Sequence, residues 1–355
     1  MKLLNETLKS IEPLNENAVK DAWKYLDGLT KPIASLGELE NIAAKMAGIT
    51  GNVHNNINKK TIIIMCADNG VQDEGVSSCP QELTWIVSNN FTRGITGVNV
   101  LADFVNSEIT VVDIGIKGEI NNTKILDRKI ANGTNNMLKG PAMTREEAIK
   151  AIETGIEIVD NLVQKGYDLF GTGEMGIGNT TTSSAILSVL SGLDVDTATG
   201  RGAALTDEQF ENKKLVIKKA IELNKPNRND IIDVISKVGG FDIAGLCGCY
   251  LGAAKNRKPI VIDGFIASAA ALCAYRLNPL VKNYIFPSHL SAEPGAKYIM
   301  NEIGLDPFLN LGMRLGEGTG CALAFNIIEA ALHVINNMGT FDQAGIVTDY
   351  LIEMR

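Results

Sequence analysis

The segment 171–184 is the part of the sequence best suited to bind a ligand. It carries four glycines within eight residues, Gly171, Gly173, Gly176 and Gly178, and a helical pattern follows them. Glycine lets the backbone approach a ligand closely and adopt positive φ. A helix start offers unpaired N–H groups and a positive dipole end. Together these features predict an anion site, most simply for a phosphate.

Three kinds of phosphate loop compete for this segment. Residues 171–176 match the dinucleotide spacing, but the required acid about twenty residues further on falls here in the loop 192–200. The triphosphate loop requires a lysine after its last glycine, where this chain has Asn179. The third interpretation is a binding site for a nucleoside monophosphate, formed by Asn179 and the hydroxyls of residues 180–184. One hydroxyl is enough for a helix cap, so five in a row favour this third interpretation.

A second segment, 311–324, places Glu317 among glycines before a helical pattern at 322–335. A carboxylate beside a helix N-terminus gains from a few tenths to about 1 kcal/mol. A carboxylate on a tight turn also suits a general base. The residues alone favour neither role.

Composition limits the classes of function. The chain has 355 residues, is 45% hydrophobic and contains 35 glycines, while aromatic residues make up only 5%. These values predict a sizeable aliphatic core. The net charge of −8 argues against nucleic-acid binding through a basic face.

The six cysteines and three histidines show no zinc-site spacing, so we expect no metal and no cofactor. Glu6 and Lys9 interrupt any apolar run at the N-terminus, which argues against a signal peptide. No stretch of about twenty apolar residues exists. We therefore expect a cytoplasmic protein without a membrane span.

Short β-rich runs alternate with longer helical patterns along the chain. The expected strands are 61–67, 108–115, 167–171, 259–263 and 284–287, and the expected helices are 81–104, 145–164, 183–190, 207–223, 242–255 and 265–277. Continuous apolar strands spaced by helices predict an α/β fold with a parallel sheet covered on both faces. This is a three-layer, Rossmann-like architecture.

The two chain ends show helical patterns without strands. We expect residues 1–50 and 312–355 to pack together as a small helical domain, with 51–311 forming the parallel-sheet domain that carries the phosphate site. Within the small domain, Ser35 is expected to cap a helix that begins at Glu38.

Polar, glycine-rich segments follow all five expected strands. They begin at Asp68, Asp113, Gly171, Asp263 and Ser288. Ligands of open α/β sheets bind at the carboxyl ends of the strands. Five such segments at one edge predict a single crevice.

Segments 171–182, 314–320 and 67–77 resemble the nicotinate-nucleotide–dimethylbenzimidazole phosphoribosyltransferase family of cobalamin nucleotide-loop assembly. Segments 31–37 and 341–345 are also similar to that family, and the likeness covers essentially the whole chain. The resemblance implies a homodimer with a parallel-sheet domain and a small helical domain.

The resemblance also implies the reaction and its substrates. The enzyme would transfer 5-phosphoribose from nicotinate mononucleotide to a benzimidazole-type base, giving α-ribazole 5′-phosphate and nicotinate. Glu317 would be the general base, and Glu174 would stabilise the positive ribosyl charge.

The resemblance and the glycine motif together define the expected binding residues. Ribose phosphate is expected at Gly173, Gly176, Gly178, Asn179, Thr180, Thr181, Gly202 and Lys213, nicotinate at Ser291 and Ala292, and the acceptor base at Ser77, Ile86, Met175 and Leu315. Arg201 is a further cationic candidate, and His289 is the histidine nearest a site loop.

Three positions depart from the family pattern. Asn69 stands where relatives commonly have histidine, Ala34 where they have glycine, and Ile86 where some have a polar residue facing the base. An apolar residue at this last position leaves adenine or a phenolic compound open as the acceptor. A non-catalytic nucleotide-binding protein is the remaining alternative, although phosphate binding alone would not require Glu317.

Overall fold

The computed structural model describes residues 1–347 and contains one six-stranded, fully parallel sheet. The strands are β1 (Lys60–Ala67), β2 (Glu108–Gly115), β3 (Leu126–Asp127), β4 (Leu169–Met175), β5 (Ile260–Ile262) and β6 (Ile285–Pro287). Their order is β3-β2-β1-β4-β5-β6, so the direction of winding reverses between β1 and β4. The α/β, Rossmann-like prediction is confirmed.

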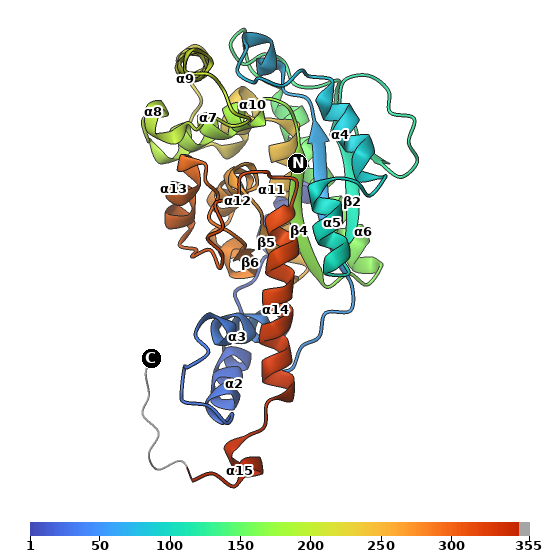
Figure 1. Cartoon of the computed structure of the whole chain (residues 1–355). Helices are drawn as coiled ribbons and strands as arrows, with labels where there is room; N and C mark the ends of the chain where they lie inside the picture. The colour runs from blue at the N-terminus through green and yellow to red at the C-terminus, as the bar shows by residue number, and fades with distance from the viewer. Residues whose placement is uncertain (348–355) are drawn as a thin grey trace.

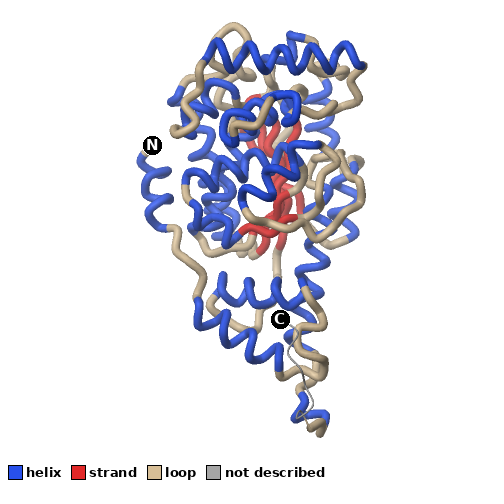
Figure 2. Tube along the Cα trace, turned by 90° about the vertical axis from the view of Figure 1, so that its left-hand side faces the viewer, coloured by secondary structure: helices blue, strands red, loops and turns tan. Residues whose placement is uncertain are grey.

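Helices cover both faces of the sheet, which lies inside the larger, upper part of the molecule (Figure 2). One face carries α6 (Arg145–Gln164), α11 (Phe241–Lys255) and α12 (Phe265–Leu277), and the other carries α4 (Leu83–Phe91), α5 (Gly97–Phe104) and α14 (Thr319–Asn337). The central strand β1 is buried from Thr61 to Ala67. This two-sided burial explains its continuous apolar run.

The remaining helices pack around this centre. They are α1 (Lys2–Ser10), α2 (Glu16–Asp27), α3 (Glu38–Thr50), α7 (Asn179–Ser191), α8 (Val195–Ala198), α9 (Asp207–Asn224), α10 (Ile231–Val238), α13 (Pro294–Ile303) and α15 (Phe341–Ala344), with short 3₁₀ helices at Gly70–Glu74 and Pro279–Tyr284.

Several expected elements differ from the structure. The helix expected at 81–104 is two helices, because the chain turns between them with Gly94 at φ 75°. The strand β3 and the helices α8, α10 and α13 were not expected. Ser35 does not cap α3; its N-cap is Gly37, and the Glu40 side chain instead accepts the Leu36 N–H.

The chain ends meet below the sheet, where α14 extends down to α2 and α3 (Figure 1). A separate apolar cluster joins α2, α3 and the end of α14 through residues such as Ala22, Leu26, Ala47 and Ile335. Helix α1, in contrast, packs against α6 and α11, with Leu4 in the main core. The two-domain division stays a prediction, and its residues 348–355 lie outside the described part.

Helix α14 is the one helix within residues 1–347 whose length and composition would allow it to cross a membrane. It packs on β4, β5, α3 and α5, and Phe325 and Ile328 are fully buried against the main core. These contacts are those of a core helix.

Candidate active site

A cavity of about 390 Å³ opens among the loops that follow β1, β4, β5 and β6. The cavity lies at the carboxyl ends of the strands, near the point between β1 and β4 where the winding reverses. Ligands of open α/β folds bind at this position. Among the residues singled out from the sequence, its lining includes Ser77, Glu174, Met175, Gly176, Gly178, Asn179, Thr180, Gly202, Ser291, Leu315 and Glu317.

Gly171 lies in β4, inside the expected strand, and β4 extends to Met175, so Gly173 also lies in the strand rather than in the glycine loop after it. A Cβ at Gly173 would lie 2.2 Å from the carbonyl oxygen of Glu317, and a Cβ at Gly171 would lie 2.7 Å from the Cβ of Cys321. These glycines therefore let the start of α14 pack directly on β4.

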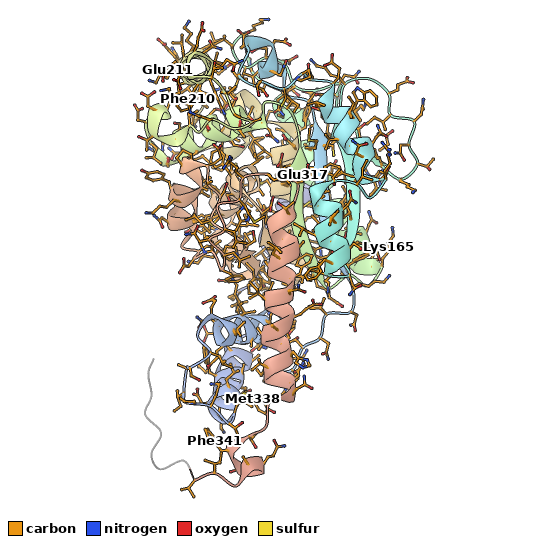
Figure 3. The ribbon with its side chains drawn as sticks, in the orientation of Figure 1. Lys165, Phe210, Glu211, Glu317, Met338 and Phe341 are labelled. Carbon is orange, nitrogen blue, oxygen red and sulfur yellow. The ribbon has the colours of Figure 1, made fainter. Side chains whose placement is uncertain are left out.

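Glu317 lies at the upper end of α14, on a turn of three consecutive positive φ angles (Figure 3). Gly316, Glu317 and Gly318 have φ of 81°, 63° and 99°, a conformation that costs free energy for a non-glycine residue. The buried carboxylate of Asp263, just after β5, accepts the N–H of Gly318 at 2.9 Å and of Gly320 at 2.6 Å. These two hydrogen bonds offset part of the strain.

The Glu317 side chain points to the start of α5, where its Oε2 accepts the Val98 N–H at 3.4 Å. Burial raises the pKa of the Glu317 carboxyl above its ordinary value, against the effect of this hydrogen bond. A raised pKa suits a general base, because it strengthens the attraction of the carboxylate for a proton.

Glu174 belongs to a buried polar cluster at the wall of the cavity. Its Oε2 accepts a hydrogen bond from the amide of Asn179, and the same Nδ2 donates to Asp242 at 3.0 Å. Burial, and then the neighbouring Asp242 carboxylate, raise the pKa of Glu174 to about 8. Burial also raises the pKa of Asp242 to about 6. The backbone N–H of Glu317 points to Oε1 of Glu174 at 3.4 Å, which links the two candidate catalytic residues.

Lys213, expected at the ribose phosphate, is fully buried and does not line the cavity. Its Nζ donates to Thr180 Oγ1 at 2.8 Å and to the carbonyl of Gly200 at 3.1 Å. Burial lowers the pKa of Lys213 to about 8, and the charge of Glu293 partly opposes this shift. The lysine thus supports the hydroxyl of Thr180, which does line the cavity.

The apolar wall differs from expectation at Ile86. This side chain lies on the partly exposed side of α4, while Leu83 and Val87 line the cavity. Leu83 and Val87, four residues apart, share a helix face, whereas Ile86 is 37% exposed and does not line the cavity. Met175 and Leu315 complete an apolar wall of the kind that would hold a flat base.

The structure places four other candidates outside the cavity lining. Thr181 is buried in α7, and Ala292 uses its N–H to bond the Met313 carbonyl at 3.0 Å. Arg201 forms an ion pair with Asp207 and stacks on Phe210. His289 is buried, with its Nδ1 3.0 Å from Ser288 Oγ, and burial lowers its pKa.

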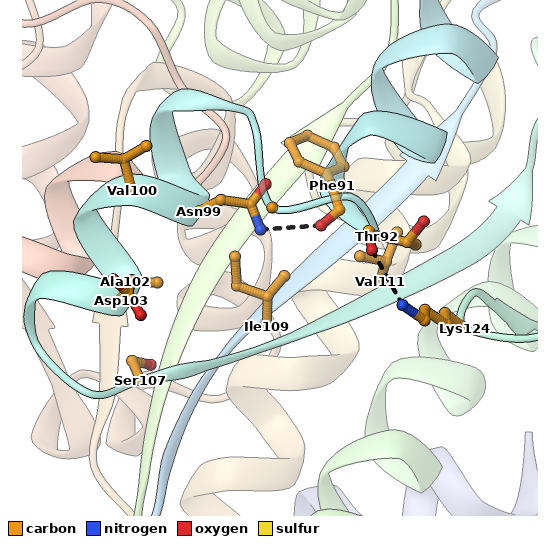
Figure 4. A pocket seen from close by; sticks show the side chains of 11 residues that line it. Phe91, Thr92, Asn99, Val100, Ala102, Asp103, Ser107, Ile109, Val111 and Lys124 are labelled. Atoms are coloured by element: carbon orange, nitrogen blue, oxygen red, sulfur yellow. Dashed lines mark hydrogen bonds between the residues drawn. The ribbon is translucent and has the colours of Figure 1, made fainter.

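Another hollow, of about 480 Å³, lies between α5 and the beginning of β2 (Figure 4). Asn99 Nδ2 donates to the Phe91 carbonyl at 2.9 Å, and Lys124 Nζ lies 3.5 Å from the Thr92 carbonyl. The hollow holds no buried carboxylate and no glycine loop, so it lacks the chemistry of the carboxyl-edge cavity.

Sequence reasoning gave no role to Asp242, Asp263 or Glu293. Asp263 and Glu293 stand in segments that follow expected strands, and that position was the available signal. Asp242 lies in an expected helix and gave no such signal. Among residues 1–347, no group of three His, Cys, Asp or Glu side chains is arranged to hold a metal ion.

Comparison with known proteins agrees with the resemblance found in the sequence. A family model described as "Phosphoribosyltransferase" matches residues 11–346. The nicotinate-nucleotide–dimethylbenzimidazole phosphoribosyltransferase of Clostridium tetani is 59% identical over 356 residues, covering 100% of this chain and 98% of that protein. The enzyme of the same name from Clostridium acetobutylicum is 56% identical, covering 97% of each chain.

A solved structure shows the same fold. CobT from Thermus thermophilus superposes with a TM-score of 0.90 at 36% identity, covering 93% of this chain and 99% of that one. The chain therefore belongs to the nicotinate-nucleotide–dimethylbenzimidazole phosphoribosyltransferase family.

Proposed function

We propose that this protein transfers 5-phosphoribose from nicotinate mononucleotide to a benzimidazole-type base, giving nicotinate and α-ribazole 5′-phosphate for the lower ligand of cobalamin. The names of its relatives support the substrates. The observation that carries the proposal is that Glu174 and Glu317 line one cavity together with an apolar wall and the hydroxyl of Thr180.

The reaction needs no acid for its leaving group. Nicotinate is attached to ribose as a pyridinium, so its nitrogen takes both electrons of the C1′–N bond and leaves without gaining a proton. The bare nitrogen of the benzimidazole forms the new bond to C1′. Its other nitrogen then loses a proton, which Glu317 is placed to accept, a contribution of about 10²–10⁴-fold.

Glu174 would acquire the charge needed on the donor side of the reaction when the donor binds. Its pKa of about 8 keeps much of this group protonated at neutral pH in the protein alone. A pyridinium ribotide brings positive charge, and an opposite charge nearby favours the carboxylate. The resulting anion stabilises the cationic character that develops at C1′.

The remaining contacts follow the shape of the cavity. Gly176, Gly178, Asn179, Thr180 and Gly202 line the ribose-phosphate end, which Gly173, Thr181 and Lys213 would support from outside the lining. Ser291 lines the nicotinate end, with Ala292 beside it in the chain, and Ser77, Met175 and Leu315 hold the base with Leu83 and Val87. No metal or cofactor is required, because the donor carries no pyrophosphate.

We also propose a cytoplasmic homodimer that binds neither membrane nor nucleic acid. An exposed apolar surface on and beside α5 supports the dimer: Phe104 is 72% exposed and Val100 62% exposed. Exposed apolar patches commonly mark protein interfaces. Sedimentation analysis of the wild type and of Phe104→Glu tests this assignment.

The activity is tested by mixing purified protein with nicotinate mononucleotide and, separately, dimethylbenzimidazole, adenine and p-cresol. Nicotinate release is measured and each product is identified by mass. Release that requires dimethylbenzimidazole and yields its riboside phosphate supports the proposal. Preference for another acceptor would change the base but keep the mechanism, and release with none would favour a binding protein.

A further inference from the structure

Glu293 lines the cavity, and one oxygen of its carboxylate has no hydrogen-bond partner among the described residues. The residue is 9% exposed and lies at the start of α13. Its Oε1 accepts the Gly202 N–H at 3.0 Å, while the buried Oε2 has no hydrogen-bond partner. An unpaired buried carboxylate oxygen costs free energy, so a ligand that donates a hydrogen bond there would be stabilised.

The surroundings of Glu293 are built to keep this oxygen in place. A Cβ at Gly200 would lie only 1.8 Å from Oε2, so a larger residue there would displace the carboxylate. The Lys213 ammonium donates to the Gly200 carbonyl, and its charge attracts that of Glu293. The hydrogen bond from the Gly202 N–H and the charge of Lys213 therefore both hold the carboxylate beside the 200–202 turn.

The chemistry of the donor limits what can occupy this position. A carboxylate accepts hydrogen bonds and repels anions, so neither the phosphate nor the nicotinate carboxylate suits Oε2. The acceptor base belongs against the apolar wall of Leu83, Val87 and Met175. The hydrogen-bond donors that remain in nicotinate mononucleotide are the ribose hydroxyls.

We propose that Glu293 recognises the ribose of the donor by accepting a hydrogen bond from one of its vicinal hydroxyls at Oε2. This inference rests on the proposed function, and it makes Glu293 a residue that selects ribonucleotides over deoxyribonucleotides. The hydrogen bond also fixes the rotation of the sugar, so that C1′ faces Glu174 and the acceptor base.

The test compares nicotinate mononucleotide with its 2′-deoxy and 3′-deoxy analogues in the wild type and three variants. Glu293→Ala removes the carboxylate, Glu293→Gln keeps an acceptor for the Gly202 N–H, and Gly200→Ala displaces the carboxylate without removing it. The exposed Glu208→Gln on α9 is the matched control. Ratios of kcat/KM between donors are compared across variants, so differences in the reactivity of the donors cancel.

Hydrogen bonds to charged groups contribute about 1.5–3 kcal/mol, which corresponds to about 10–150-fold. The wild type and Glu208→Gln should favour the ribonucleotide over one deoxy analogue by a factor in this range. The ratio should fall towards one in Glu293→Ala and Gly200→Ala. It should fall by less in Glu293→Gln, whose amide forms a weaker, neutral hydrogen bond.

Unchanged ratios in Glu293→Ala would overturn the proposal and leave Glu293 as an anchor for the 200–202 turn. A lower KM for all donors in Glu293→Ala, with the ratio retained, would also overturn it, because the carboxylate would then only compete with phosphate. If the wild type releases no nicotinate with any base, the proposed function is wrong. Calorimetric binding of the three donors would then test ribose recognition by itself.

Discussion

Asp263 and Glu317 are joined through the backbone of one turn. Each oxygen of the Asp263 carboxylate accepts one amide from the start of α14, Oδ2 from Gly318 and Oδ1 from Gly320. Glu317 immediately precedes the first of these glycines and has a φ of 63°. A buried carboxylate just after β5 thus fixes the backbone from which the proposed general base projects.

Asp263→Asn should reduce kcat more than it changes the affinity for nicotinate mononucleotide. An amide supplies one acceptor where the carboxylate supplies two, so one amide of the strained turn loses its partner. We expect kcat to fall about 10–100-fold, as a displacement of a catalytic group of about 1 Å would predict. Steady-state kinetics and calorimetric binding measure the two effects.

Asp194→Asn is the matched control, because Asp194 also caps a helix but is exposed and does not line the cavity. It should leave kcat unchanged. If Asp263→Asn has wild-type kcat, the turn does not depend on Asp263.

Gly173→Ala should impair catalysis without introducing a polar or charged group. The new Cβ would lie 2.2 Å from the Glu317 carbonyl, which is backbone and cannot simply rotate away. Overpacking of this kind costs about 1–3 kcal/mol in stability and would move the Glu317 turn. In Gly28→Ala the nearest atom would be at 3.4 Å, an ordinary contact. Equal kcat in the two variants would contradict this role of Gly173.

Loss of the Lys213 charge should lower kcat/KM as pH rises through about 8, against an opposite effect from the ionisation of Glu174. Burial lowers the pKa of Lys213 to about 8, so its ammonium is charged below that pH and neutral above it. Loss of the charge weakens support for the phosphate end. The decrease of kcat/KM at high pH reports on the free enzyme, and its apparent pKa should therefore be about 8. Lys213→Met should have low kcat/KM throughout and lack this decrease; a decrease that persists in the variant would exclude Lys213 as its source.

The stability of the protein without substrates should fall between about pH 4.5 and about pH 8. Glu174 has an ordinary value of 4.5, and its pKa in the folded protein is about 8. Within this window the folded state holds a proton that the unfolded state has released, so raising the pH favours unfolding. Thermal melts should show a smaller decline for Glu174→Gln than for the control Glu208→Gln. Equal declines would show that Glu174 does not titrate in this way.

The architecture and the location of the site followed from local sequence patterns. Continuous apolar runs such as 108–115 predicted buried parallel strands, and the glycines and carboxylates after them predicted the carboxyl-edge cavity. These features were accessible because strand burial and ligand-binding loops leave their marks over short stretches of sequence.

Packing between distant segments could not be predicted in this way. Gly171 and Gly173 resembled loop glycines, but their small size serves the contact of β4 with α14, about 145 residues away. Similarly, Lys213 was expected at the ribose phosphate, but tertiary contacts that the local sequence does not show bury it against Thr180. Ile86 was placed in the base pocket by the family resemblance, which did not show that this side chain lies on the exposed side of α4.

The central claim is that Glu317 accepts the proton of the acceptor base in the cavity. The most direct measurement is dimethylbenzimidazole-dependent nicotinate release by wild type and Glu317→Gln, together with calorimetric binding of nicotinate mononucleotide. The account predicts a kcat lowered by about 10²–10⁴-fold in the variant with donor affinity retained. A variant that releases nicotinate at the wild-type rate would contradict it.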